Sequence, residues 1–164
     1  MEIKNKPQIF IHSWLPDDLL SRLEKNFDID HHDTSEVILS GNKLLDKVID
    51  VEVILALSPI IDKALIQSCS NLKIVSNVGV GFDNIDVNFC TQMGIQVTNT
   101  PGILNDAVAD MSMALLLAIA RRVPEGDRIV RSGGFKANFY RLLWGADLKG
   151  ENLGIIGMGS IGQD

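Results

Sequence analysis

Three glycines near the end of the sequence stand at the spacing Gly-x-Gly-x-x-Gly, as Gly157, Gly159 and Gly162. An apolar segment at residues 152–156 precedes them and is predicted to form a strand. The first glycine would permit a tight turn, the second would let the backbone approach a pyrophosphate, and the third would let a following helix pack closely. The amide groups at the start of that helix would face the anion. The pattern therefore favours dinucleotide binding over a plain tight turn.

A second glycine-rich segment, residues 76–84 with the sequence SNVGVGFDN, follows a predicted strand at residues 73–77. Ligands of open α/β sheets gather at the carboxyl ends of strands. Successive glycine N–H groups there would form a concave donor site for a small anion such as a carboxylate. The alternative is a strand-end turn in which Asp83 and Asn84 bind local backbone donors, and the residues alone favour this alternative.

The other residue types that often carry chemistry lack a useful spacing. His31 and His32 are adjacent, so in a strand they would point to opposite faces and could not share a metal ion. His12 ends a predicted strand without a ligand partner in the sequence around it. Cys69 and Cys90 belong to no CxxC pair and are expected to be small core residues. We therefore predict no metal site and no cysteine nucleophile among these residues.

The elements that would position both glycine segments alternate between strands and helices. The interval from one predicted strand to the next leaves room for one helix and two short loops. Asp86 is expected to cap a helix that Gly94 closes. This alternation predicts an α/β fold around a parallel sheet. The predicted strands of that sheet are residues 8–12, 27–31, 51–57, 73–77 and 95–98.

The longest predicted helix covers residues 104–122. Residues 113–120 are apolar on every side, so this half of the helix is expected to be enclosed. An aromatic arm follows, and its expected role is packing. The arm consists of Phe135, Phe139, Tyr140 and Trp144.

Composition narrows the class of partner. The content of 46% hydrophobic and 22% charged residues is typical of a globular protein. A formal charge of −6 opposes nucleic acid or an anionic membrane as the main partner. The longest nearly apolar run, residues 111–120, is shorter than the roughly 20 residues of a membrane span. With two cysteines and no apolar signal core at residues 1–7, we expect a soluble, cytoplasmic protein.

Three segments in this order carry a resemblance to a known family: NVGVGFDNID at residues 77–86, NTPG at 99–102 with AVAD at 107–110, and GIIGMGSIG at 154–162. Together they resemble the D-isomer-specific 2-hydroxyacid dehydrogenases. Within that family the sequence is most similar to glyoxylate, hydroxypyruvate and 2-ketogluconate reductases. Asp110 stands where family members more often carry Glu, and its expected role is structural.

The resemblance implies two domains joined by a hinge. Residues 1–100 would form a flavodoxin-like substrate domain. Residues 101–164 would hold the connecting helix, a dimer arm and the first strand of a truncated Rossmann domain. The family reaction is reversible hydride transfer between a nicotinamide cofactor, NAD or NADP, and C2 of a small 2-keto or D-2-hydroxy acid. The long helix and the aromatic arm would contribute to a homodimer interface.

The resemblance also implies roles for individual residues. The amides of Val80 and Gly81 would receive the substrate carboxylate, and Leu57 and Ser58 would border that site. Val108 would lie near the nicotinamide end of the cofactor. The residues under the pyrophosphate would be those of the glycine turn: Gly157, Gly159, Ser160, Ile161 and Gly162.

The family's substrate-orienting arginine and its acid–base pair of histidine and glutamate would lie beyond Asp164. The sequence is therefore expected to be the N-terminal portion of such an enzyme and to be inactive alone. The strand at 152–156 would lack a neighbouring strand. We accordingly expect mobility after about residue 145, or pairing of the apolar helix with another copy.

Two alternatives stay open. A non-catalytic, NADH-sensing binding module is one, because the carboxy-terminal-binding-protein corepressors share this architecture. A response-regulator-like receiver is the other, because it shares the sheet type. The second alternative is opposed by residues 12–15, which read His-Ser-Trp-Leu where a receiver carries an acidic pair.

Overall fold

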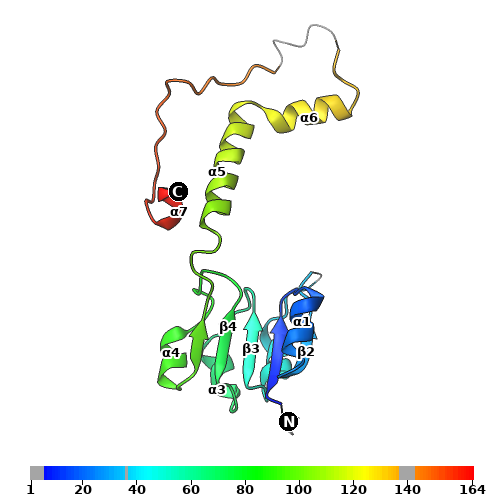
Figure 1. Ribbon diagram of the computed structural model, residues 1–164, viewed down its shortest axis with the longest axis vertical. Helices are drawn as coiled ribbons and strands as arrows, with labels where there is room; N and C mark the ends of the chain where they lie inside the picture. The colour runs from blue at the N-terminus through cyan, green and yellow to red at the C-terminus, as the bar shows by residue number, and fades with distance from the viewer. Residues whose placement is uncertain (1–5, 36, 137–142) are drawn as a thin grey trace. The chain divides into compact units, whose positions relative to one another are not determined.

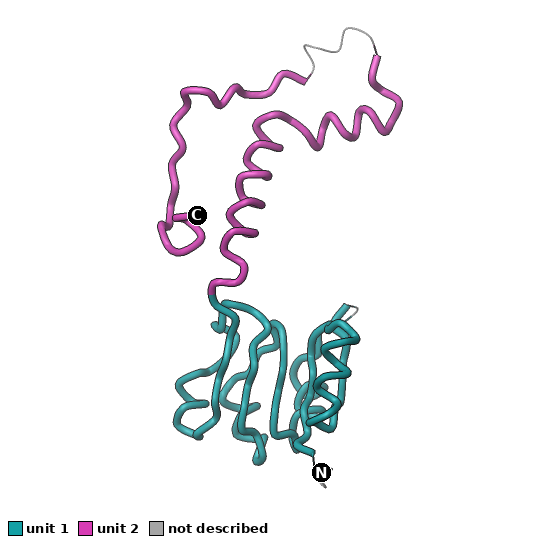
Figure 2. Tube along the Cα trace, in the orientation of Figure 1, with its two compact units in different colours: residues 1–101 teal, residues 102–164 magenta. Residues whose placement is uncertain are grey.

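The computed structural model describes residues 6–35, 37–136 and 143–164. The chain divides into two compact units, Met1–Pro101 and Gly102–Asp164 (Figure 2).

The first unit is built on a five-stranded parallel sheet (Figure 1). Its strand order is β2-β1-β3-β4-β5, the flavodoxin-like order, so the chain reverses its direction of growth between β1 and β3. The predicted α/β class is confirmed, and each strand begins within two residues of its predicted start. The strands are β1 (Gln8–His12), β2 (Asp28–His32), β3 (Val53–Ala56), β4 (Ile74–Asn77) and β5 (Gln96–Thr98).

Alternate residues of β1 pack into two separate cores. Ile9 and Ile11 face the smaller core, to which α1 contributes Leu20 and Leu23. Phe10 faces the larger core, which takes its helical side chains from α2, α3 and α4. Both faces of the sheet are therefore covered, which explains why its central strand β3 is entirely apolar. The helices are α1 (Asp17–Leu23), α2 (Gly41–Val48), α3 (Lys63–Ser68) and α4 (Val87–Gln92).

Two of these helices begin at an aspartate whose side chain satisfies a free backbone donor. The Asp62 carboxylate accepts from the Leu65 amide at 2.9 Å, and the Asp86 carboxylate accepts from the Phe89 amide at 2.9 Å. The cap predicted at Asp86 is thus confirmed. Because Asp86 fixes the start of α4, it also fixes where the preceding glycine-rich loop ends.

The second unit contains α5 (Asn105–Ala120), α6 (Val123–Arg131) and α7 (Ser160–Gln163). The long predicted helix is confirmed as α5, but the predicted enclosure of its apolar half is not. Four of its apolar side chains remain between 47% and 75% exposed, because the described part of the chain covers α5 mainly with the short helices α6 and α7. These side chains are Met113, Leu115, Leu117 and Ile119. No helix in the described ranges is long and apolar enough to cross a membrane.

Residues 152–156 differ from the sequence prediction, because the structure forms no strand there. A strand needs a neighbour for its backbone N–H and C=O groups, and no described residue pairs with this segment. The aromatic arm is partly outside the described residues, since Phe139 and Tyr140 fall there. Its described members Phe135 and Trp144 are exposed.

Candidate functional site

The loop at residues 78–84, which follows β4, is held from inside by one buried amide side chain. Asn77 is only 4% exposed at the end of β4. Its Nδ2 donates to the carbonyl oxygens of Gly79, at 3.1 Å, and Gly81, at 2.6 Å. A single side chain therefore binds two of the loop's carbonyl groups and orients the peptides between them.

The segment after β5 holds the same loop from outside. Asn99 Nδ2 donates to the Val80 carbonyl at 2.8 Å, and the Thr100 amide donates to the Gly79 carbonyl at 3.2 Å. The Thr100 hydroxyl donates to the Val78 carbonyl at 3.2 Å. Four successive carbonyl groups, from residue 78 to residue 81, thus accept hydrogen bonds from the protein.

The amide groups on the opposite side of these peptides are left available. Among the described residues, no acceptor binds the N–H groups of Val80 and Gly81, and both residues are exposed. Backbone N–H groups that face solvent together, with their carbonyls fixed elsewhere, form a binding site for an anion. The structure therefore places the two predicted substrate-binding amides in one loop with the polarity that a carboxylate needs.

The loop after β3 lies against the 78–84 loop and closes one side of a cavity of about 340 Å³. Asn84 Nδ2 joins the two loops by donating to the Pro59 carbonyl at 2.8 Å. Leu57 and Ser58, the other predicted substrate-site residues, both line this cavity. Ser58 is held at φ 68°, a left-handed conformation that is uncommon for a residue with a side chain. The full lining is Leu57, Ser58, Asn77, Gly79, Gly81, Asp83 and Asn84.

The cavity's charge is acidic, since Asp83 is its one charged lining residue among those described. A bound carboxylate would therefore be attracted by the backbone amides and repelled by Asp83. No group of three or more metal-ligating side chains occurs among the described residues.

The predicted glycine turn lies in the second unit, immediately before α7. Gly157 adopts φ 99°, which an L side chain rarely adopts, and so it makes the tight turn. A Cβ at Gly162 would overlap the carbonyl oxygen of Gly157, so the start of α7 can approach the turn only because this residue is glycine. A Cβ at Gly159 would meet no atom within 4 Å. The space in front of Gly159 is therefore open.

The residues predicted under the pyrophosphate begin α7. Gly159 is its N-cap residue, and the Ser160 and Ile161 N–H groups meet no acceptor among the described residues. The first N–H groups of a helix have no partner within the helix and favour anions. Val108, the predicted nicotinamide neighbour, lies in the first turns of α5, the helix that α7 contacts. Val108 is 40% exposed.

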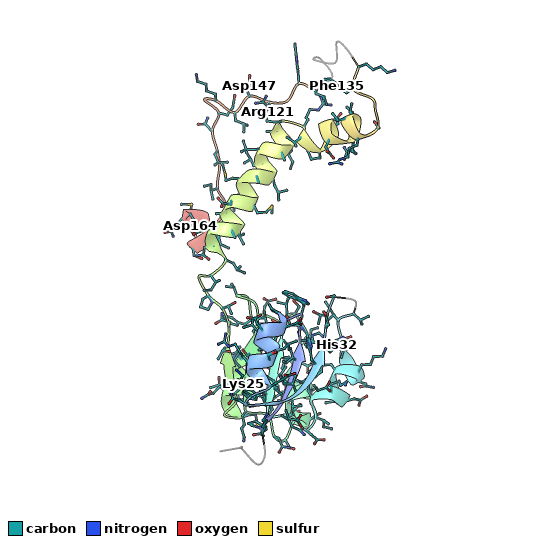
Figure 3. The ribbon with its side chains drawn as sticks, turned by 45° about the vertical axis from the view of Figure 1, so that its right-hand side comes forward. Lys25, His32, Arg121, Phe135, Asp147 and Asp164 are labelled. Carbon is teal, nitrogen blue, oxygen red and sulfur yellow. The ribbon has the colours of Figure 1, made fainter. Side chains whose placement is uncertain are left out.

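The histidines occupy a different part of the first unit. His31 Nε2 bonds with the Ser13 carbonyl at 2.9 Å, and His32 Nε2 bonds with the Val37 carbonyl at 2.9 Å. His12 is fully buried, and its ring stacks on His32 with the centroids 5.5 Å apart (Figure 3 labels His32). None of the three lines the cavity beside the 78–84 loop.

Sequence reasoning missed two features of these sites. It did not single out Asn77 and Asn99 as the side chains that orient the loop, because their positions near strand ends do not show which carbonyl groups they bind. It also treated His12 and His32 separately. They end neighbouring parallel strands in register, so their positions at two strand ends were the available signal.

With this geometry in view, comparison with known proteins identifies the class. The model of the family described as D-isomer specific 2-hydroxyacid dehydrogenase, catalytic domain, matches residues 9–161. The chain belongs to this family. The resemblance inferred from the three sequence segments is therefore confirmed.

Individual relatives agree with this assignment. The chain is 42% identical over 163 residues to a glyoxylate reductase from Thermococcus litoralis, a match that covers 96% of the chain and 49% of the relative. It is similar in structure, with a TM-score of 0.88 and 37% identity, to the TT0316 protein from Thermus thermophilus, covering 95% of the chain and 50% of that protein.

A third relative was solved with ligands. It is an NADPH-dependent glyoxylate/hydroxypyruvate reductase from Sinorhizobium meliloti, in complex with NADP and malonate. Its TM-score is 0.72 at 29% identity, over 97% of the chain and 48% of that protein. The chain spans about half the length of the curated relatives that it matches.

Proposed function

We propose that this chain forms part of an NAD(P)-dependent oxidoreductase that transfers a hydride between a nicotinamide cofactor and a small 2-keto or D-2-hydroxy acid. Glyoxylate is the first candidate substrate, with hydroxypyruvate and 2-ketogluconate next. Family membership supports the reaction class. The observation that carries the proposal is the 78–84 loop, whose carbonyl groups are bound by the protein while the Val80 and Gly81 amides are not.

The proposed role of the first unit is to hold the acid. The Val80 and Gly81 amides would donate to its carboxylate, while Leu57 and Ser58 would border the rest of the molecule in the adjoining cavity. Two backbone donors position an anion without adding a charge of their own. Asp83 in the same cavity would weaken the binding of an acid with a second carboxylate near it.

The proposed role of the second unit is to hold the pyrophosphate of NAD or NADP through Gly157, Gly159, Ser160, Ile161 and Gly162. The open space at Gly159 and the free amides of Ser160 and Ile161 support this role. When bound, the cofactor supplies the hydride. Val108, exposed on α5 of the same unit, is the proposed neighbour of the nicotinamide.

None of the three histidines is placed for the proton transfer that accompanies hydride transfer. His12 is buried, and His31 and His32 bind backbone carbonyl groups away from the cavity. We therefore expect the 164-residue chain alone to give no turnover of glyoxylate with NADH or NADPH. Steady oxidation of the reduced cofactor, followed by its absorbance, would contradict this expectation.

Anion binding by the loop is tested by titrating the ¹⁵N-labelled chain with glyoxylate and following its amide signals. We expect saturable shifts at Val80 and Gly81, because these amides would donate to the carboxylate. The turn amide of Gly94, on the other side of α4, is the internal control and should not shift. Glyoxylamide, which is uncharged, should shift the loop signals far less. Equal shifts from both compounds, or shifts spread over the whole chain, would overturn the proposed site.

We also propose that the protein is a cytoplasmic homodimer. The exposed apolar side chains of α5, such as Leu115 and Leu117, support self-association, because apolar surface of this kind favours contact with another surface. Both cysteines are free and buried, which agrees with a reducing compartment. Sedimentation velocity on the wild-type chain and a Leu117→Glu variant tests the dimer. A monomer at all concentrations, or a dimer that Leu117→Glu leaves intact, would contradict it.

A further inference from the structure

His12 is the buried polar side chain of the first unit with the most unusual hydrogen bonding. It ends β1 and is 0% exposed. Its Nε2 lies 2.8 Å from the backbone nitrogen of Leu39, which can only donate. The Nε2 atom must therefore be an unprotonated acceptor, so a neutral His12 ring carries its proton on Nδ1.

The Nδ1 atom is buried and meets no hydrogen-bond partner among the described residues. Moving the proton to Nε2 would not relieve this, because Nε2–H would then oppose the Leu39 N–H. A buried donor without an acceptor is costly, and few native side chains are left so. The contact with the Leu39 N–H therefore selects the neutral tautomer that carries its proton on Nδ1. The charged ring fits the site worse, because it adds a donor on Nε2 that faces the Leu39 N–H.

The surroundings of His12 oppose a positive charge. Burial is the largest influence lowering the pKa of His12, and the neighbouring His32 lowers it further. The backbone groups of His12 and Leu57 act in the opposite direction, but neither meets Nδ1 in hydrogen-bonding geometry. The His32 ring stacks on His12 with an angle of 19° between the ring planes, so charge on one ring is felt directly by the other.

The elements around His12 contribute few other titratable groups. On β2, His32 stacks on it and His31 bonds to Ser13 instead. The register partner on β3 is Ala56. Asp33, after β2, accepts from the hydroxyl and amide of Ser35. The 37–40 segment carries no ionisable side chain, and those of α2 are exposed: Lys43, Asp46 and Lys47.

We propose that His12 is a proton-operated latch that fastens the Leu39 end of the 37–40 segment to the sheet while neutral and releases that end when protonated. In the neutral state Nε2 accepts from Leu39 and holds this segment over the end of β1. Protonation turns Nε2 into a donor, so the bond to Leu39 is lost and two donors face each other. His32 behaves differently, because its Nε2 donates to the Val37 carbonyl in either charge state.

The latch extends to the loop after β3. The Leu57 amide donates to the His12 carbonyl at 3.1 Å, so the backbone that carries the histidine also anchors Leu57. Leu57 begins the segment that borders the cavity beside the 78–84 loop. When the His12 ring leaves its site, the Leu57 amide is expected to lose protection together with the Leu39 amide. This inference concerns the chain itself and does not depend on the function proposed above.

The test is amide hydrogen exchange of the 164-residue chain from about pH 7.5 down to a pH at which the His12 imidazole is protonated, corrected for the intrinsic pH dependence of exchange. Because burial lowers the pKa of His12, that pH lies below about 6.5. We expect the protection of the Leu39 amide to fall by about tenfold or more, the effect of losing one hydrogen bond. The Leu57 amide should follow with the same midpoint. A ¹⁵N spectrum of the imidazoles should show His12 protonated on Nδ1 and bare on Nε2 at the higher pH.

Two variants separate the latch from general acid sensitivity. His12→Phe keeps a ring but cannot titrate, so its Leu39 protection should not change over this pH range. His31→Gln removes a neighbouring exposed histidine and should retain the wild-type fall. A fall that persists in His12→Phe, or an unchanged Leu39 amide while His12 titrates, would overturn the proposal. If His12→Phe does not fold, the wild-type tautomer decides, since a proton on Nε2 of His12 would also overturn it.

Discussion

The two glycine-rich segments of this chain offer the same groups, free backbone amides, but hold them in different ways. In the first unit, the 78–84 loop is braced by side chains from β4 and from the segment after β5, chiefly Asn77 and Asn99. In the second unit, the turn at 157–162 is shaped by its own backbone, through the positive φ of Gly157 and the close approach at Gly162. Two glycine-rich segments can therefore be disrupted by different substitutions. The 78–84 loop depends on side chains from other parts of the sequence, whereas the 157–162 turn depends on the lack of side chains at its glycines.

The largest expected effect is that of Asn77→Asp. The new carboxylate would be buried against the carbonyl oxygens of Gly79 and Gly81, which it would repel instead of binding. We expect a loss of about 3 kcal/mol or more in the free energy of unfolding, measured by urea denaturation at neutral pH. Asn71→Asp is the matched control, because Asn71 also donates to a backbone carbonyl but is exposed. Equal losses in the two variants would show that Asn77 is not a buried brace.

Gly162→Ala tests whether the close approach of Gly162 to Gly157 shapes the 157–162 turn. The added methyl group would overlap the Gly157 carbonyl, so the turn must open and α7 should be lost, while the first unit is unaffected. The ¹³C chemical shifts of residues 160–163 report the helix. Gly154→Ala is the control, since a Cβ there meets no atom within 4 Å. If Gly162→Ala keeps helical chemical shifts at residues 160–163, α7 does not require the close approach between Gly162 and Gly157.

Asn99→Ala should have a smaller effect on stability than Asn77→Asp. It deletes one partly exposed hydrogen bond to the Val80 carbonyl, worth about 1 kcal/mol. The freed peptide can then rotate, so the glyoxylate-induced shift at Val80 should weaken more than the stability does. The exposed Asn26→Ala variant should change neither measurement. Unaltered shifts in Asn99→Ala would mean that the loop holds its amides without this bond.

The smallest expected effect is a pH dependence confined to the first unit. Because the folded state lowers the pKa of His12, the unfolded chain binds more protons than the folded chain below about pH 6.5. The free energy of unfolding should therefore have its highest value at neutral pH, as far as His12 contributes to it. It should decline as the pH falls from about 6.5 through the folded pKa of His12. All three histidines precede residue 33, so the protection of the 157–162 turn, corrected for intrinsic exchange, should stay constant over that window. A parallel loss of protection in both segments would point to global unfolding.

Much of the fold could be predicted because it depends on local patterns. Alternation and turn residues located the five strands, and Asp86 revealed its cap through its position before a helical segment. The bracing of the 78–84 loop could not be predicted in the same way. The hydrogen bond from Asn99 to Val80 joins residues 19 positions apart in the sequence, and no local sequence pattern around either residue predicts it.

The failures have the same origin. Residues 152–156 carry the apolar composition of a strand, yet a strand requires a partner, and composition does not supply one. The apolar side chains of α5 predict burial, but they do not say which surface will cover them. The register that stacks His12 on His32 is likewise a property of two strands together.

The left-handed backbone at Ser58 has a consequence for anyone who wishes to re-engineer this chain. A residue with a side chain is held there at an energetic disadvantage of about 1–2 kcal/mol relative to an unstrained position. The substitution Ser58→Gly would relieve this backbone strain and would also remove the Ser58 hydroxyl. Glycine at position 58 would therefore raise the stability of the fold but remove a hydroxyl group that borders the cavity. A variant stabilised in this way would be a poor starting point for changing which acid the cavity accepts.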